Sequence, residues 1–410
     1  MNTKIVAVAL VAILVVAGVA VFFLMGGKGG NSEDKGLSVV GRVNSEGSGI
    51  ILDPSQNADD YITVTDEPLL GSYTIYNEKQ SKYYNLHANG WGGKIFATPG
   101  TATIQHVQLS QLAAGMNLKF VAYTEGATLK ADTLYYVPSI ASFADFVNAQ
   151  KNTNLAGFII WEAQYSVGVV KGYTGLVKTN DIFENHTCCI IGATNKYLNH
   201  NEEAFVSFLS VYVAAVDRIN AALADKSSAD YNQLVTIAMN RVTMPDGMTE
   251  DEKSEAIKSA LDNVTYVYAD NGSGSLDNLE ADIASLAQKL YDAGAIQKTA
   301  KDLGFKSYSE MAAKFVIEDY MEEALKINDG KLASKAVINV AAIKGDIHQI
   351  ALWFAQDTGM FAAKNLDVKI SQQVNGPGIY TQLANGESDI GFLGAPPMTI
   401  RSVNGEDIKP

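Results

Sequence analysis

The sequence predicts an α/β protein, because short β-branched segments alternate with segments of helical periodicity along most of its 410 residues. Two further observations support this prediction. At about 150 residues per domain, the length corresponds to two or three compact units. The composition, with 47% hydrophobic residues, is typical of a chain with an extensive core and excludes a wholly disordered chain.

The chain opens with a long apolar segment. Residues 5–25 read IVAVALVAILVVAGVAVFFLM and carry no charge. As a helix they would be about 31 Å long, which matches a bilayer core of about 30 Å. The apolar region of a cleaved signal is usually about 7–15 residues, so we expect an uncleaved anchor, with a cleaved signal peptide as the alternative. The glycine-rich residues 26–36 predict a flexible tether that leaves the rest of the chain outside the cell.

The first half after the tether alternates between strands and helices. The predicted strands are residues 37–43, 94–100, 118–123, 156–161 and 188–193. The predicted helices are residues 101–115, 141–150 and 162–171. Residues 53–90 are rich in Asp, Asn and Tyr and are predicted to be irregular, with a hairpin as the alternative.

The second half is mostly helical before the alternation returns. Helices are predicted at residues 203–224, 228–242, 249–261, 277–293 and 308–325. The polar residues 328–335 indicate a linker. Strands then follow at residues 337–343, 366–370 and 389–394, with one helix from the loop 344–346 to about 363 and another, after a Gly-Pro-Gly turn, to 384.

Charge and motifs exclude several classes of function. With 31 Lys and Arg against 45 Asp and Glu, the net charge of −14 argues against a nucleic-acid partner. The sequence contains no phosphate-binding loop, nucleophile elbow or zinc-binding helix motif, and its five histidines lack metal-ligand spacing. The adjacent Cys188 and Cys189 follow His186, which permits a metal or nucleophile, but we favour packing. We therefore predict no metal, no cofactor and no enzyme activity.

Four loops between a strand end and a helix start predict a ligand cleft. Such loops present free N–H groups and the positive end of a helix dipole to a polar ligand. In open α/β sheets, ligands bind at the carboxyl ends of the strands, so these loops could face one cleft. Each loop alone is ordinary turn chemistry. The loops are residues 98–103, 345–349, 375–378 and 394–397.

Several segments resemble the substrate-binding proteins of the nitrate/sulfonate/taurine ABC importer family. GDIHQIALWFAQDTGMFAAKNLDVKI (345–370) and residues 375–410 resemble the opening of these proteins. WGGKIFATPGTATIQHVQLSQLAAG (91–115) resembles the start of their second lobe. GFIIWEAQYSVGVVKGY (157–173) and the stretch from IFENHTCC at 182 resemble their "W-E-P" and "N-H-P-C-C" stretches, with alanine and threonine in place of the prolines.

The resemblance implies a two-lobed, periplasmic-binding-protein-like (type II) α/β fold with a ligand cleft between the lobes, preceded by an N-terminal transmembrane helix. The segments occur in an unusual order, because the family's opening stretch lies at the C-terminus. We expect a circular permutant whose old termini are joined through residues 328–335, or else a truncated tandem protein. The expected domains are an anchor and tether at 1–36, a discontinuous lobe 1 at 37–52 with 195–410, and lobe 2 at 53–194.

The resemblance also implies which residues bind the ligand. Those of the first lobe are Asp346, His348, Gln349, Gly376, Gly378, Gly394, Ala395 and Pro396. Those of the crossing between the lobes are Asn44, Ser45, Glu46 and Gly47. Those of the second lobe are Gly100, Thr101, Thr103, Trp161, Glu162 and His186. If Asp346 and Glu46 face the ligand, their charges disfavour a bare anion and leave a zwitterion, an amine or a heterocycle in play.

The function implied by the resemblance is the extracytoplasmic solute-binding component of an ABC importer. Such a protein captures a small polar solute, of the sulfonate, nitrate, taurine or thiamine-precursor class, and delivers it to a permease and its ATPase. We expect a monomer held at the cell membrane by a single-pass anchor, or a secreted protein if the signal is cleaved. The alternatives are a thiamine-pyrimidine-synthase-like enzyme on the same fold and the sensor domain of a receptor.

Overall fold

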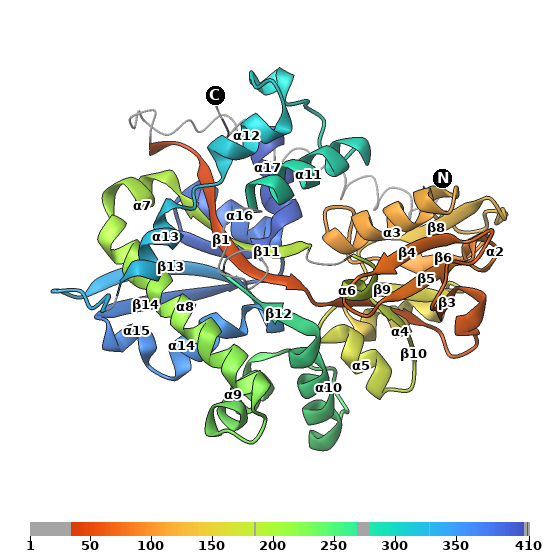
Figure 1. The fold of residues 1–410 in the computed structure, drawn as a ribbon, viewed down its shortest axis with the longest axis horizontal. Helices are drawn as coiled ribbons and strands as arrows, with labels where there is room; N and C mark the ends of the chain where they lie inside the picture. Colours follow the sequence, from red (N-terminus) through yellow and green to blue (C-terminus); the bar gives the residue numbers. More distant parts are fainter. Residues whose placement is uncertain (1–33, 184–185, 269–278, 328, 406–407, 409–410) are drawn as a thin grey trace, which may run out of the picture.

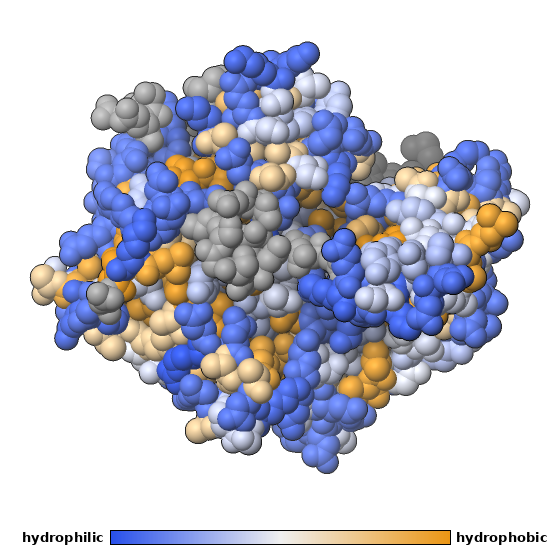
Figure 2. All heavy atoms as spheres, viewed as in Figure 1, coloured by the Kyte–Doolittle hydropathy of each residue, from blue (hydrophilic) through white to orange (hydrophobic). Residues whose placement is uncertain are grey.

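The computed structural model describes residues 34–183, 186–268, 279–327, 329–405 and 408. The predicted membrane anchor at residues 5–25 lies outside the described residues. The described chain forms an α/β structure with two mixed six-stranded sheets and one three-stranded sheet (Figure 1), which confirms the α/β class. Most of the face drawn in Figure 2 is hydrophilic, consistent with a composition rich in acidic residues.

The first sheet combines strands from both ends of the chain. Its strand order is β12 (Val264–Tyr266), β1 (Leu37–Glu46), β11 (Thr187–Thr194), β15 (Ile390–Gly394), β13 (Ala336–Ile343) and β14 (Leu366–Gln373). β13 pairs in parallel with β14 and β15, whereas β11 is antiparallel to both β15 and β1. The N-terminal β1 therefore completes a sheet whose parallel strands come from the last 75 residues.

Helices cover both faces of the first sheet. One face packs against α8 (Glu202–Ala224), α9 (Ala229–Arg241), α10 (Glu250–Asn263), α13 (Asp319–Lys326), α14 (Ile350–Asp357) and α15 (Met360–Ala363). The other packs against α11 (Leu279–Asp292), α12 (Tyr308–Phe315), α16 (Gly376–Asn385) and α17 (Ala395–Gly405). Successive residues of β1 point to opposite faces, so Val39 packs with the second group of helices and Val40 with the first.

The second sheet has a closely similar plan. Its strand order is β10 (Thr174–Lys178), β2 (Ser48–Leu52), β9 (Gly157–Trp161), β6 (Ile95–Ala97), β8 (Thr133–Val137) and β7 (Lys119–Ala122). β6 pairs in parallel with β8 and β9, and β2 is antiparallel to β9 and β10. The helices packed on this sheet are α3 (Ile104–Gly115), α4 (Phe143–Gln150) and α5 (Gln164–Val170).

Two connections join the sheets. β1 continues through Gly47 into β2, and α6 (Thr179–Ile182) leads from β10 to β11. The strand that arrives from the other sheet, β11 in the first sheet and β2 in the second, is antiparallel to both of its neighbours. The boundaries predicted after residues 52 and 194 differ from this arrangement, because β2 already pairs within the second sheet and β11 within the first.

Residues 53–90 are more regular than the sequence predicts. They form a three-stranded antiparallel sheet of β3 (Ile62–Thr65), β5 (Lys82–Leu86) and β4 (Tyr73–Asn77), followed by α2 (Ala88–Trp91). Alternate residues Ile62, Tyr84 and Leu86 are buried in the core under the second sheet. The sequence conceals this pattern because each strand has only four or five residues and the segment between β3 and β4 contains the exposed apolar residues Leu69 and Leu70.

Several predicted helices are interrupted. The helix predicted at 308–325 is divided into α12 and α13, because the Ile317 N–H donates to the Val39 carbonyl at 2.8 Å instead of continuing a helix. The helix predicted to end near 363 is divided between α14 and α15 at Gly359, whose φ is 75°. The loops predicted at 375–378 and 394–397 are the first turns of α16 and α17. One further helix, α7 (Asn195–His200), lies between β11 and α8.

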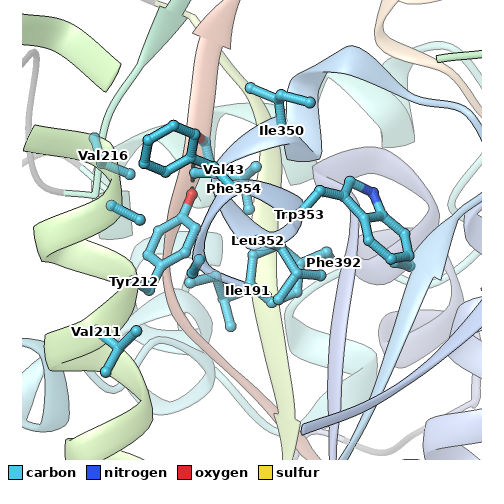
Figure 3. Close-up of a cluster of buried hydrophobic side chains, with 14 of the residues drawn as sticks. Val43, Ile191, Val211, Tyr212, Val216, Ile350, Leu352, Trp353, Phe354 and Phe392 are labelled. Carbon is cyan, nitrogen blue, oxygen red and sulfur yellow. Dashed lines mark hydrogen bonds between the residues drawn. The ribbon is translucent and has the colours of Figure 1, made fainter. Parts of the chain in front are cut away.

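Among the described residues, α8 alone is long and apolar enough to span a membrane by length and composition. Most of its apolar window is buried in the protein. In Figure 3, Tyr212 and Val216 of α8 point toward Val43 of β1, Ile191 of β11 and Phe354 of α14. The apolar face of α8 is thus accounted for by packing against the first sheet.

Candidate functional site

The crossing from β1 to β2 is buried and sharply bent. Glu46 and Gly47 have positive φ values of 67° and 86°. Asn44 fixes the bend, because its Nδ2 donates to the Glu46 carbonyl at 2.9 Å while its Oδ1 accepts from the Cys189 N–H at 3.2 Å. Both ends of the Asn44 amide are therefore bound to backbone groups of the crossing and of β11.

The carbonyl of Gly47 is where strand ends from the two sheets meet. His348, which follows β13 of the first sheet, donates to it from Nε2 at 2.9 Å. The N–H of Glu162, which follows β9 of the second sheet, donates to the same oxygen at 2.9 Å. The carboxyl ends of β13 and β9 therefore converge on one atom of the crossing.

His348 is held in its charged form by Asp346. The Asp346 Oδ1 accepts from both the backbone N–H of His348, at 3.1 Å, and its Nδ1, at 2.7 Å. Since the Gly47 carbonyl can only accept, both ring nitrogens are donors. Burial by itself would lower the pKa of His348, but the charge and hydrogen bond of Asp346 outweigh it and raise the pKa to about 9.

Two further carboxylates at the crossing are bound by protein groups. Glu46 accepts from the Thr265 hydroxyl at 3.0 Å and lies 3.9 Å from the Lys79 Nζ. Glu162 accepts from the Ser166 N–H at 3.1 Å and from Asn263 Nδ2 at 2.7 Å. Burial raises the pKa of Glu162.

These partners change the charge argument made from the sequence. Asp346 is paired with a protonated His348, and Glu46 is bound to Thr265 and close to Lys79. Neither carboxylate is free to face a ligand as an uncompensated charge. Repulsion by Asp346 and Glu46 is therefore no reason to exclude an anionic ligand.

Gln349 is a structural bridge in this arrangement. Its side chain is fully buried, its Oε1 accepts from the Ile343 N–H at 2.8 Å, and its Nε2 donates to the Phe392 carbonyl at 2.8 Å. We expect Gln349→Met to destabilise the protein by about 1–3 kcal/mol for each of these two unpaired backbone groups. Urea unfolding measures this loss.

The matched control for that variant is Gln356→Met, at an exposed position of α14, which should change stability by less than about 0.5 kcal/mol. If Gln349→Met instead kept full stability while ligand affinity fell, Gln349 would be a ligand-binding residue.

The other predicted residues of the first sheet lie where two helices begin. A Cβ added to Gly376 at the start of α16 would lie 2.6 Å from Pro397 Cγ, so this glycine permits the close approach of α17. Gly394 borders the same proline, and Ala395 and Pro396 are buried beside it. The N–H of Gly378 donates to its own helix cap, Asn375, at 3.0 Å.

The predicted residues of the second sheet include the start of α3. Thr103 caps this helix, because its hydroxyl donates to the Gly100 carbonyl at 2.7 Å and accepts from the His106 N–H. Thr101 is exposed beside it, and Ile104 packs against the core of the first sheet. Trp161 is half-buried at the end of β9. The structure thus brings the start of α3 against the first sheet and beside the crossing, where Gln105 Nε2 donates to Ser48 Oγ at 2.8 Å.

His186 links the two sheets through neutral hydrogen bonds. Its Nδ1 donates to the Phe183 carbonyl at 2.7 Å, and its Nε2 accepts from Gln108 Nε2 of α3 at 3.0 Å. Burial lowers the pKa of His186. The adjacent Cys188 and Cys189 are free and buried in the core, with 3.9 Å between their sulfurs. Across the described ranges, no group of three His, Cys, Asp or Glu residues could hold a metal ion.

Two hollows lie away from the crossing. One, of about 670 Å³, is bordered by residues 34–37, by α7 and by the end of α16. The other, of about 680 Å³, lies between α11 and the segment 299–309. Neither includes a residue predicted to bind the ligand.

Comparisons of the chain with protein-family profiles, with curated proteins and with solved structures gave no match.

Proposed function

We propose that this protein is the extracytoplasmic solute-binding component of an ABC importer, with a two-lobed, periplasmic-binding-protein-like (type II) fold. One observation carries the proposal. Two sheets of closely similar strand order exchange one antiparallel strand each, and the carboxyl ends of β13 and β9 meet at the carbonyl of Gly47 between them. Ligands of open α/β sheets bind at such strand ends.

The two connections between the sheets suit a hinge. Rotation about Gly47 and about the α6–β11 connection would part the lobes, and a bound solute would stabilise the closed arrangement. No chemical step is needed, because the differential affinity of the solute for the closed form supplies the free energy. The presence of β1 in the same sheet as β13, β14 and β15 supports a first lobe built from both ends of the chain.

The solute in this proposal is small and polar, of the sulfonate, nitrate, taurine or thiamine-precursor class. The partners are a membrane permease and its ATPase, and the monomeric protein is held at the cell membrane by the apolar residues 5–25. Secretion after cleavage of a signal peptide is the alternative location.

Thermal unfolding of the full-length protein with a panel of solutes tests the proposal. Nitrate, taurine, alkanesulfonates and aminopyrimidines form the panel, and one of them should stabilise the protein without being consumed. A solute present at 100 times its Kd stabilises by about 2.7 kcal/mol. Turnover of a panel member would favour an enzyme, and absence of binding by every polar solute tried would overturn the proposal.

Replacing Trp161 should weaken binding of the solute found in this way. The aromatic ring of Trp161 stands half-buried at the end of β9, and loss of such a contact costs about 1–2 kcal/mol or more, which is at least fivefold in Kd. Calorimetric titration of Trp161→Ala measures the change. Tyr76→Ala, at an exposed aromatic of the three-stranded sheet, is the control and should bind normally. Equal affinities for the two variants would remove Trp161 from the site.

A further inference from the structure

Buried polar atoms that lack hydrogen-bond partners gather on one side of the crossing. Within the described part of the chain, no partner is found for Arg42 Nε and Nη1, Ser45 Oγ or Gln108 Oε1. The Arg42 side chain is only 1% exposed and is held by a single ion pair, from Nη2 to Asp282 Oδ2 at 3.0 Å. A buried polar group without a partner is costly, so such groups in native proteins require an explanation.

These atoms belong to one surface around Thr187. The Thr187 hydroxyl donates to Asp282 Oδ2 at 2.7 Å, the oxygen that also binds Arg42. Ser45 stands directly opposite Thr187 in the β1–β11 ladder and therefore points to the same face of the sheet. His186 precedes Thr187 and accepts from the Gln108 amide at 3.0 Å. We refer to Arg42, Ser45 and Gln108 as the Arg42 site.

The donors and acceptors of the Arg42 site define a complementary ligand. Arg42 can donate up to three hydrogen bonds from Nε and Nη1, whereas Gln108 Oε1 can only accept one from a ligand donor. The Ser45 hydroxyl can donate or accept. The charge of Arg42 is already paired with Asp282, so a buried anion would leave the site with a net negative charge. A neutral group with a carbonyl oxygen beside an N–H meets every requirement.

We propose that the Arg42 site binds the amide, ureide or lactam group of an uncharged solute. This inference rests on the proposed function and names the class of solute. The ligand carbonyl accepts from Arg42, and the ligand N–H donates to Gln108 Oε1.

The two lobes contribute differently to this site. Arg42 and Ser45 belong to β1 of the first sheet, whereas Gln108 belongs to α3, which packs on the second sheet. Val107 of the same helix is buried in the core of the first sheet, so α3 covers the site in this structure. Parting of the lobes would uncover Ser45 and Arg42, and closing would bring Gln108 onto the bound solute.

Calorimetric titration of the full-length protein with uracil, hydantoin and acetamide tests the class of ligand. Acetate, methanesulfonate and nitrate are the charged comparison probes. At least one neutral probe should bind, with its affinity reduced about fivefold or more by Ser45→Ala or Gln108→Leu, and abolished by Arg42→Met. Binding of the anions in preference to the neutral probes would overturn the class of ligand.

The stability of the ligand-free variants tests the site independently. Because Ser45 Oγ has no partner to lose, Ser45→Ala should keep or raise the melting temperature. Gln108→Leu is left out of this test, because it also removes the hydrogen bond from Gln108 Nε2 to His186 Nε2. Ser402→Ala is the matched control, since its buried hydroxyl in α17 also lacks a partner within the described residues; it should leave affinity unchanged.

The possible failures are distinguishable. If a panel solute binds and all three Arg42-site variants retain its affinity, the site is wrong while the solute-binding function stands. If Ser45→Ala lowers the ligand-free melting temperature, the Ser45 hydroxyl has a structural role and the inference fails. If no solute binds the unmodified protein, both proposals fail.

Discussion

Gly47→Ala is expected to destabilise the protein by about 2–4 kcal/mol, because two independent costs add at this position. The φ of +86° suits glycine and strains alanine by about 1 kcal/mol. An added Cβ would also lie 2.6 Å from His348 Nε2 and 2.9 Å from Val264 Cγ2. Relief of such overpacking costs about 1–3 kcal/mol more and would displace His348 from the Gly47 carbonyl.

Gly172→Ala is the matched control for this variant. Gly172 has the same φ of +86°, but nothing lies within 4 Å of the position its Cβ would occupy. It should therefore lose only the strain of about 1 kcal/mol. Urea unfolding of the two variants separates the strain from the steric contact. An equal loss for both would mean that the crossing is loosely packed and does not fix the strand ends.

The alternation of strands and helices could be predicted from the sequence, but the crossing could not. Residues 44–49 read NSEGSG, which is turn-rich by composition, yet these residues end β1 and begin β2 with every side chain buried. Burial and pairing on both sides override the low strand propensity of Asn, Ser and Gly. The sequence also does not predict β12, because its three residues directly follow α10 and no turn residue separates the strand from the helix.

The sequence indicates which residues lie near the crossing, but it does not indicate their hydrogen-bond partners. Asp346, His348, Glu46 and Glu162 were all expected at a cleft, and each lies at the crossing. Their partners could not be foreseen, since the His348–Gly47 bond joins residues 301 positions apart.

Arg42 and Gln108 carry no sequence signal of their own. Arg42 lies within a β-branched strand segment, and Gln108 lies within a helix of regular spacing. Their partnerless nitrogen and oxygen atoms become evident only when burial and hydrogen bonds are known.

The stability of the protein is expected to fall by about 3 kcal/mol as the pH rises from 6.5 to 9, because of His348. Its pKa is near 6.5 when unfolded and about 9 in the folded protein, and each pKa unit corresponds to about 1.4 kcal/mol. Below pH 6.5 both states are protonated and the stabilisation by Asp346 is complete. Between pH 6.5 and 9 the unfolded chain releases its proton while the folded protein keeps it, so the stabilisation is progressively lost.

Urea unfolding between pH 6 and 9.5 measures this dependence, and His348→Gln should remove most of it. His106→Gln is the control above about pH 7.5, where His106 is neutral in the folded protein, since burial lowers its pKa to about 4, and also neutral in the unfolded chain. Comparison with Cys188→Ala removes the contribution of the neighbouring thiol, whose pKa is lowered mainly by its hydrogen bond with Cys189. If His348→Gln folds poorly, an NMR titration of the unmodified protein gives the same information. A His348 ring that loses its proton below pH 7 would contradict the charged Asp346–His348 pair, and with it the strong donor that ties the first sheet to the Gly47 carbonyl.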